Sequence, residues 1–82
     1  MRPDIVIHIL KVLSLCKHFK LPQPALFERV RIRSGEDLPH DALLENLTFA
    51  ESKGWLASDV NAFGTKRYWI TEAGEIQLSG YV

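Results

Sequence analysis

The basic side chains of this 82-residue sequence are its most evident candidates for chemistry, because they are unevenly placed. Residues 1–33 hold seven Lys or Arg against two Asp or Glu, a net charge of +5. Residues 34–82 hold three against eight, a net charge of −5. The formal total is zero, yet the folded chain is expected to be an electrical dipole. A neutral total therefore does not exclude a polyanionic partner.

The three histidines are the next candidates, for metal binding or acid–base chemistry. His8, His18 and His40 are widely separated, and no Cys or carboxylate lies at a zinc-like spacing from them. The sequence also contains no nucleophile elbow, no P-loop and no dinucleotide-binding glycine pattern. We therefore expect no metal site, no cofactor and no enzymatic activity.

Length and composition favour one small soluble domain over residues 1–82, with a single modest core. Cys16 is the single cysteine, so an intrachain disulfide is impossible and a reducing compartment fits best. The apolar run 5–15 is interrupted by polar residues and is too short to cross a bilayer. A cytoplasmic protein that does not associate with membranes is the resulting prediction.

Helical periodicity predicts a first helix from about Pro3 to His18. One broad apolar arc of its wheel holds Ile5, Val6, Ile9, Val12, Leu13, Cys16 and Phe19. Two apolar residues, Ile7 and Leu15, fall in the polar sector instead. They are either ordinary exposed apolar surface or part of a subunit interface.

Two more helices are predicted after the break at residues 21–24. Pro24 can start a second helix, which carries Leu26, Phe27 and Val30 on one face. A turn at residues 33–37 then leads to a third helix that ends at Gly54, a suitable C-cap. The third helix is expected to bury Leu43, Leu44, Leu47 and Ala50. Its outward side chains are expected to be Asp41, Ala42, Glu45, Asn46, Thr48, Phe49, Ser52 and Lys53.

The last part of the chain reads as a β-hairpin followed by a short helix. Residues 55–59 and 66–71 are predicted strands, joined by a turn at residues 60–65. Tyr68 and Ile70 should share one face of the second strand, and Arg67 and Trp69 the other. Thr71 is the expected N-cap of the closing helix.

This order of elements, with "LLENLTFAESKGWL" (43–56) and "KRYWITEAG" (66–74), resembles the winged helix-turn-helix domains of bacterial and phage transcription regulators. PadR-like and MarR-like families are among them. The resemblance spans about residues 21–78. It implies an α+β fold with a three-helix core, a two-stranded β-hairpin wing and a short C-terminal helix. The helix at about 39–53 would be the recognition helix, and the pattern apolar-Thr-x-x-Gly would close the wing. The long connection between residues 30 and 39 is similar to that of the PadR-like variety.

The resemblance implies a small transcription regulator that binds double-stranded DNA as a homodimer. The recognition helix would enter the major groove, and the wing would contact the backbone. The expected DNA-binding residues are His40, Asp41, Glu45, Asn46, Lys53, Lys66, Arg67, Arg31 and Arg33. Carboxylates repel phosphates, but they can accept a hydrogen bond from cytosine N4. Equally, these acids could simply face water near the helix N-terminus, and the basic residues could be a solvated surface or, in the hairpin, protect a strand edge.

A winged-helix domain that binds another protein instead of DNA is the alternative. Its contacts would be the apolar residues that the core does not explain, since interfaces favour aromatic anchors. These are Ile7, Leu15, Phe49 and Trp69. Salt-dependent binding to arbitrary duplex DNA would distinguish the two functions.

Overall fold

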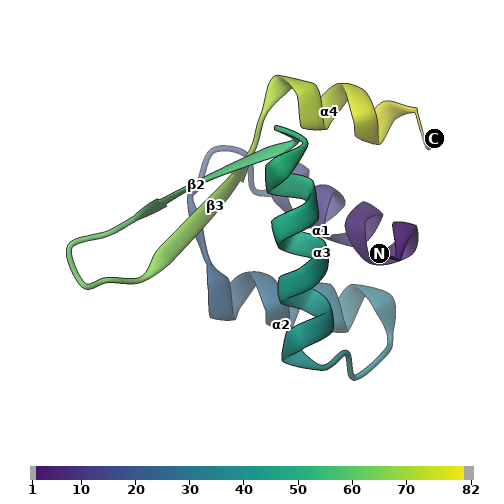
Figure 1. The fold of residues 1–82 in the computed structure, drawn as a ribbon, viewed down its shortest axis with the longest axis horizontal. Coiled ribbons are helices and arrows are strands. Elements are labelled where there is room, and N and C mark those ends of the chain that lie inside the picture. Colours follow the sequence, from purple (N-terminus) through teal and green to yellow (C-terminus); the bar gives the residue numbers. More distant parts are fainter. Residues whose placement is uncertain (1, 81–82) are drawn as a thin grey trace.

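The computed structural model describes residues 2–80 and contains four helices and three strands over that range. In chain order they are α1 (Pro3–Leu15), β1 (Leu21–Pro22), α2 (Gln23–Ser34), α3 (His40–Ser52), β2 (Leu56–Val60), β3 (Lys66–Ile70) and α4 (Glu72–Ser79). Figure 1 shows α3 crossing in front of α1 and α2, with α4 at one end and the β2–β3 hairpin projecting from the helices. The chain thus has the expected α+β, winged helix-turn-helix fold.

The sheet has one more strand than predicted. All pairings are antiparallel in the order β1-β3-β2, and Tyr68 of β3 lies opposite both Leu21 and Ser58. Residues 21–24 were expected only to break the chain, because two residues are too few to show a strand periodicity. Pro22 is compatible with this position since β1 is an edge strand.

The core is built from the apolar faces of the helices and the inward face of β3. Its fully buried side chains include Ile5, Leu26, Leu43, Leu47 and Tyr68. The hydroxyl of Tyr68 donates a hydrogen bond to Gln23 Oε1 at 3.0 Å, so this buried ring carries no unsatisfied polar group. The predicted facing of the second hairpin strand is confirmed, because Tyr68 and Ile70 are buried while Arg67 and Trp69 are half-buried.

Two side chains expected in the core are exposed. α1 ends at Leu15 rather than near His18, so Phe19 leaves the helical register and is 71% exposed. Leu44 of α3 is 39% exposed, because α3 packs through a narrower stripe that includes Leu43, Leu47 and Ala50. Both side chains are therefore available on the surface.

The junction between β3 and α4 depends on the motif Thr-x-x-Gly. The Thr71 side chain accepts a hydrogen bond from Gly74 N at 3.1 Å, which confirms the predicted N-cap, and donates one to Gly54 O at 2.5 Å. Gly74 is buried directly against the backbone carbonyl of Trp55. Together these contacts fix the start of α4 against the loop that precedes β2.

The connection from α2 to α3 positions the exposed helix. Gly35 ends α2 in the left-handed conformation with φ 72°, which glycine adopts without steric cost. Leu38 is buried, and its carbonyl accepts a hydrogen bond from Arg31 Nε at 2.8 Å. These contacts anchor the connection before α3 begins at His40. Within residues 2–80, no helix has the length and apolar character needed to span a membrane.

Candidate nucleic-acid interface

The outward face of α3 is uncovered by the rest of the described chain. Asp41 and Glu45 are exposed, as predicted. His40 is also exposed, and Leu44, which is 39% exposed, lines a hollow together with the two acids. The His40 ring also contacts the edge of the Phe27 ring, with centroids 5.2 Å apart. α3 contains three acids and no Lys or Arg. Its exposed surface is therefore acidic and includes one partly exposed apolar side chain, that of Leu44.

Asn46 does not lie on this face, and its predicted outward position is wrong. The side chain is only 2% exposed. Its Oδ1 accepts a hydrogen bond from Arg2 N at 2.9 Å, and its Nδ2 donates one to Ala42 O at 2.7 Å. Helical periodicity places a polar residue outside by default, whereas here the chain entering α1 supplies a backbone donor that makes burial favourable. Asn46 is a structural residue that ties α3 to the start of α1.

Phe49 was also expected to point outward and does not. It is half-buried, packs against the core, and meets the Trp55 ring edge-on with centroids 5.9 Å apart. Lys53, which follows α3, lies with its ammonium 5.5 Å from the Phe49 ring, within cation–π distance. Ile7 is likewise partly buried against the core. Their packing within the subunit accounts for Phe49 and Ile7 without a partner.

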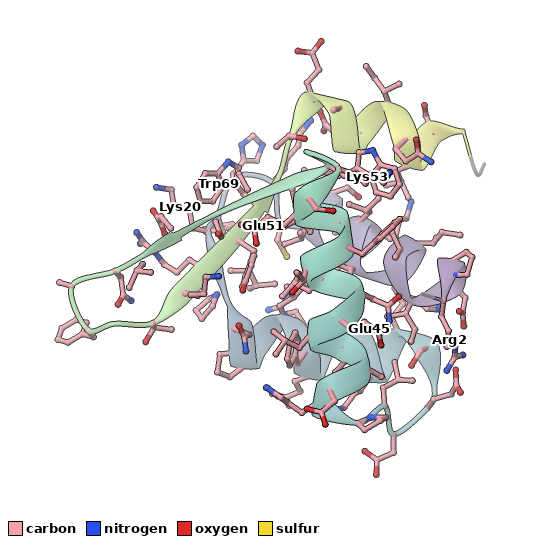
Figure 2. All side chains as sticks on the ribbon, viewed as in Figure 1. Arg2, Lys20, Glu45, Glu51, Lys53 and Trp69 are labelled. Atoms are coloured by element: carbon pink, nitrogen blue, oxygen red, sulfur yellow. The ribbon has the colours of Figure 1, made fainter. Side chains whose placement is uncertain are left out.

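The wing carries a cluster of three charges that the sequence did not indicate. Arg67 binds Asp59 on β2 through two hydrogen bonds, of 3.0 and 2.9 Å, and Lys20 binds the same carboxylate at 2.9 Å. The Lys20 ammonium also lies 4.9 Å from the centre of the Trp69 ring. Figure 2 shows Lys20 and Trp69 together on one side of the hairpin. Both cations are thus partly neutralised, and Trp69 is partly covered.

Acid should weaken this cluster. The hydrogen bonds from Lys20 and Arg67 hold the pKa of Asp59 below its ordinary value of 3.8. A lowered folded-state pKa contributes stability that is fully present above about pH 4 and is lost as the pH falls through the folded-state value. Thermal unfolding followed from about pH 5 to about pH 2 should show a declining midpoint.

Asp59→Asn is the matched control, and it should make this decline shallower. The decline should not vanish, because Arg2 lowers the pKa of Asp4 in the same way. Parallel curves for the two proteins would contradict a stabilising role of the Asp59 cluster.

The remaining predicted basic residues differ in their exposure and in the contacts that their side chains make within the subunit. Lys66 is exposed at the start of β3, with its ammonium 5.7 Å from the Tyr68 ring. Arg33 is exposed on α2, and no hydrogen bond or ion pair joins its side chain to another residue within 2–80. Arg31 is half-buried, and its Nε donates a hydrogen bond to Leu38 O. Among the predicted basic residues, Lys66, Lys53 and Arg33 are therefore the most available to an external anion.

Three surface features were missed by the sequence reasoning. Lys20 was not assigned a role, although its charge neutralises the wing carboxylate. Ile32 of α2 is 74% exposed, beside the predicted interface residue Leu15, which is 68% exposed. Phe19 lies near them, in a second hollow that also includes Leu15. The exposure of Ile32 could have been inferred from its position among Arg29, Arg31 and Arg33, outside the apolar face of α2.

Metal chemistry finds no support among residues 2–80, where no group of three or more His, Cys, Asp or Glu side chains could hold an ion. The described chain offers an uncovered face of α3, a projecting hairpin and several exposed cations. Such features suit contact with an extended macromolecule.

Comparison with solved structures finds a protein from Thermoplasma acidophilum described as a candidate transcriptional regulator. The TM-score is 0.73 and the sequence identity 26%, over 94% of this chain and 73% of that chain. No family model matches the sequence, and no curated protein matches it. The fold of this chain is therefore one that a candidate transcriptional regulator also adopts.

Proposed function

We propose that the chain is a small DNA-binding transcription regulator, with α3 in the major groove and the β2–β3 wing on the DNA backbone. The observation that carries this proposal is the uncovered face of α3 beside a wing with an exposed Lys66, on a fold shared with a candidate transcriptional regulator. The proposal includes a homodimer that acts in the cytoplasm and has no catalytic activity. PadR-like and MarR-like regulators are the families that the sequence resembles.

The exposed residues divide between reading bases and holding phosphates. Asp41 and Glu45 can accept hydrogen bonds from cytosine N4, and His40 can contact a base edge. Lys53, Lys66 and Arg33 supply the positive charge that phosphates require. Arg67 and Arg31 contribute less, because Asp59 and Leu38 O already accept hydrogen bonds from them. Asn46 has no place in this interface, since both ends of its amide are bonded inside the subunit.

Titration with duplex DNA tests the proposal. Each protomer supplies few free cations, so binding depends on a dimer that doubles their number. With about six phosphate contacts, affinity should fall by about three decades between roughly 50 and 200 mM salt. Fluorescence anisotropy with a labelled random duplex measures this change. Failure to bind at the lower salt concentration would overturn the proposal.

Lys66→Ala should reduce the salt dependence. The substitution removes one exposed cation from each wing, so the slope of log K against log salt should become shallower by about 0.9 per wing that contacts DNA. Affinity should fall for all sequences alike, because a phosphate contact carries no base information. Lys17→Ala is the control, because Lys17 pairs with Glu75 on the α1–α4 surface and should leave the slope unchanged. Equal slopes for Lys66→Ala and the parent protein would remove the wing from the interface.

A protein-interaction module is the second candidate function. The acidic face of α3, which includes the partly exposed Leu44, favours it, because carboxylates oppose phosphate binding. This function predicts no binding to any duplex at low salt. The same titration therefore separates the two candidates.

A further inference from the structure

The outward faces of α2 and α3 carry the same pattern with opposite charge. Arg29, Ile32 and Arg33 are exposed on α2, and Asp41, Leu44 and Glu45 are exposed on α3. In each set, two charges of the same sign lie four positions apart, and an aliphatic residue directly precedes the second charge. The two charges of each set are one helical turn apart, about 6 Å along the axis. We call these sets the basic face and the acidic face.

The basic face borders an apolar groove between α1 and α2. One hollow, of about 260 Å³, is lined by Val12, Leu15, Cys16, Arg29, Ile32 and Arg33. A second, of about 430 Å³, shares Leu15, Cys16 and Arg29 with the first and extends past Phe19 to Pro22. No carboxylate lines either hollow. The groove is therefore apolar inside with only positive charge at its rim.

The acidic face surrounds a shallower hollow. Its lining is Asp41, Leu44, Glu45 and Thr48, without any cation. Figure 2 places Glu45 on the side of α3 away from the hairpin, so the wing does not cover it. Leu44 is the apolar residue that this face offers to a partner.

The four charges on these two faces are not neutralised within the described chain. Over residues 2–80, no ion pair involves Arg29, Arg33, Asp41 or Glu45. The Arg29 guanidinium donates a hydrogen bond of 3.5 Å to Cys16 Sγ, which is a weak acceptor. Both faces therefore keep their charge for an external partner.

We propose that the basic face of one copy binds the acidic face of a second copy of this chain. The matched one-turn spacing lets Arg29 and Arg33 face Asp41 and Glu45 across two packed helices. Leu44 would then meet Ile32 and the apolar groove that Leu15 lines. Burial of these apolar side chains would supply the favourable free energy of association, and the charges would determine which face of the partner is bound.

Charge also excludes the simplest alternatives. Two basic faces brought together would place Arg29 and Arg33 against their own copies, and two acidic faces would do the same with carboxylates. Like charges brought together at an interface oppose association. The contact is therefore between unlike faces. Repeated from copy to copy, it closes into a dimer or ring, or continues as a longer assembly, depending on the rotation between neighbouring copies.

This contact would cover the α3 surface that the proposed function places in the DNA major groove, so association through these two faces would compete with DNA binding and is not the homodimer that binds DNA. The inference does not depend on DNA binding, because it rests only on the two complementary faces. Its test accordingly contains no DNA.

Charge reversal followed by mixing tests the contact. Sedimentation velocity of the full chain at low salt and rising concentration should show a mass that at least doubles. R29E/R33E makes the basic face acidic, and D41R/E45R makes the acidic face basic. Each variant alone should sediment at a lower mass than the parent chain, because its two faces now carry the same sign. An equimolar mixture should associate again, because every contact between the two variants pairs unlike charges.

K53E/K66E is the matched control, since it reverses two cations outside both faces and should associate like the parent chain. Circular dichroism checks that each variant is folded. If a reversed variant does not fold, R29Q/R33Q and D41N/E45N test the same contact through loss of association. The proposal is overturned if a folded reversed or neutralised variant alone reaches the mass of the parent chain, or if mixing the two folded reversed variants does not raise their mass.

Discussion

Replacing Gly74 with alanine is expected to lower the free energy of unfolding by about 3 kcal/mol or more, because the new methyl group has no space. A Cβ at this position would overlap the backbone carbonyl oxygen of Trp55 and would lie 2.8 Å from Ile70 Cγ1. The backbone at Trp55 cannot easily retreat. Its carbonyl accepts a hydrogen bond from Thr71 N at 3.1 Å, and its N–H donates one to Ala50 O at 3.1 Å.

Thermal unfolding followed by circular dichroism measures this loss. For a domain of this size, 3 kcal/mol corresponds to a midpoint lower by roughly 12–24 °C. Gly80→Ala is the control, because Gly80 has φ −70° and a Cβ there would meet only Gln77 O at 3.3 Å. It should change stability by no more than about 0.5 kcal/mol. Similar midpoints for the two variants would show that α4 is not held tightly against Trp55.

Asn46→Ala is expected to cost about 2 kcal/mol of stability, and it should not alter base preference. The substitution removes the acceptor of the Arg2 N–H and the donor to Ala42 O, and it leaves a cavity beside α1. If Asn46 instead read a base, stability would change little and discrimination at one base pair would fall by about 1–3 kcal/mol. Because Asn46 is buried, we expect the first outcome, a loss of stability with no change in base preference.

Two measurements distinguish these outcomes. The thermal midpoint should fall by roughly 8–16 °C. The ratio of the DNA affinity for one fixed sequence to that for a random duplex, measured well below that midpoint, should not change. Thr48→Ala is the control, because Thr48 is exposed on the same helix and should cost no more than about 0.5 kcal/mol. A normal midpoint with an altered ratio would restore Asn46 as a base-reading residue.

The periodic parts of the fold could be predicted from the sequence. α2, α3 and the hairpin lie within a few residues of their expected positions, and Thr71 caps α4 as expected. Apolar residues recurring every third or fourth position, or every second, report directly which face of an element is buried. β1 was missed because a two-residue strand has no period, and its pairing with β3 depends on a chain segment more than forty residues away.

The candidate site could be predicted only in part. The exposure of Asp41, Glu45 and Lys66 followed from their polarity and helical or hairpin positions. The burial of Asn46 and the ion pair of Arg67 were not foreseen for a common reason: each side chain has a partner from another part of the chain, Arg2 and Asp59 respectively, and no local pattern reveals such a partner.

The sequence by itself determined the helices and the β-hairpin, their order and the winged-helix fold class, because periodicity, capping residues and turn residues act over a few neighbouring positions. The tertiary structure alone decided which charges are free. Arg67 and Lys20 share one carboxylate, whereas Arg29, Arg33, Asp41 and Glu45 form no ion pair within residues 2–80. Whether a charge is neutralised depends on distances of a few ångströms between residues far apart in the chain, and only folding sets those distances.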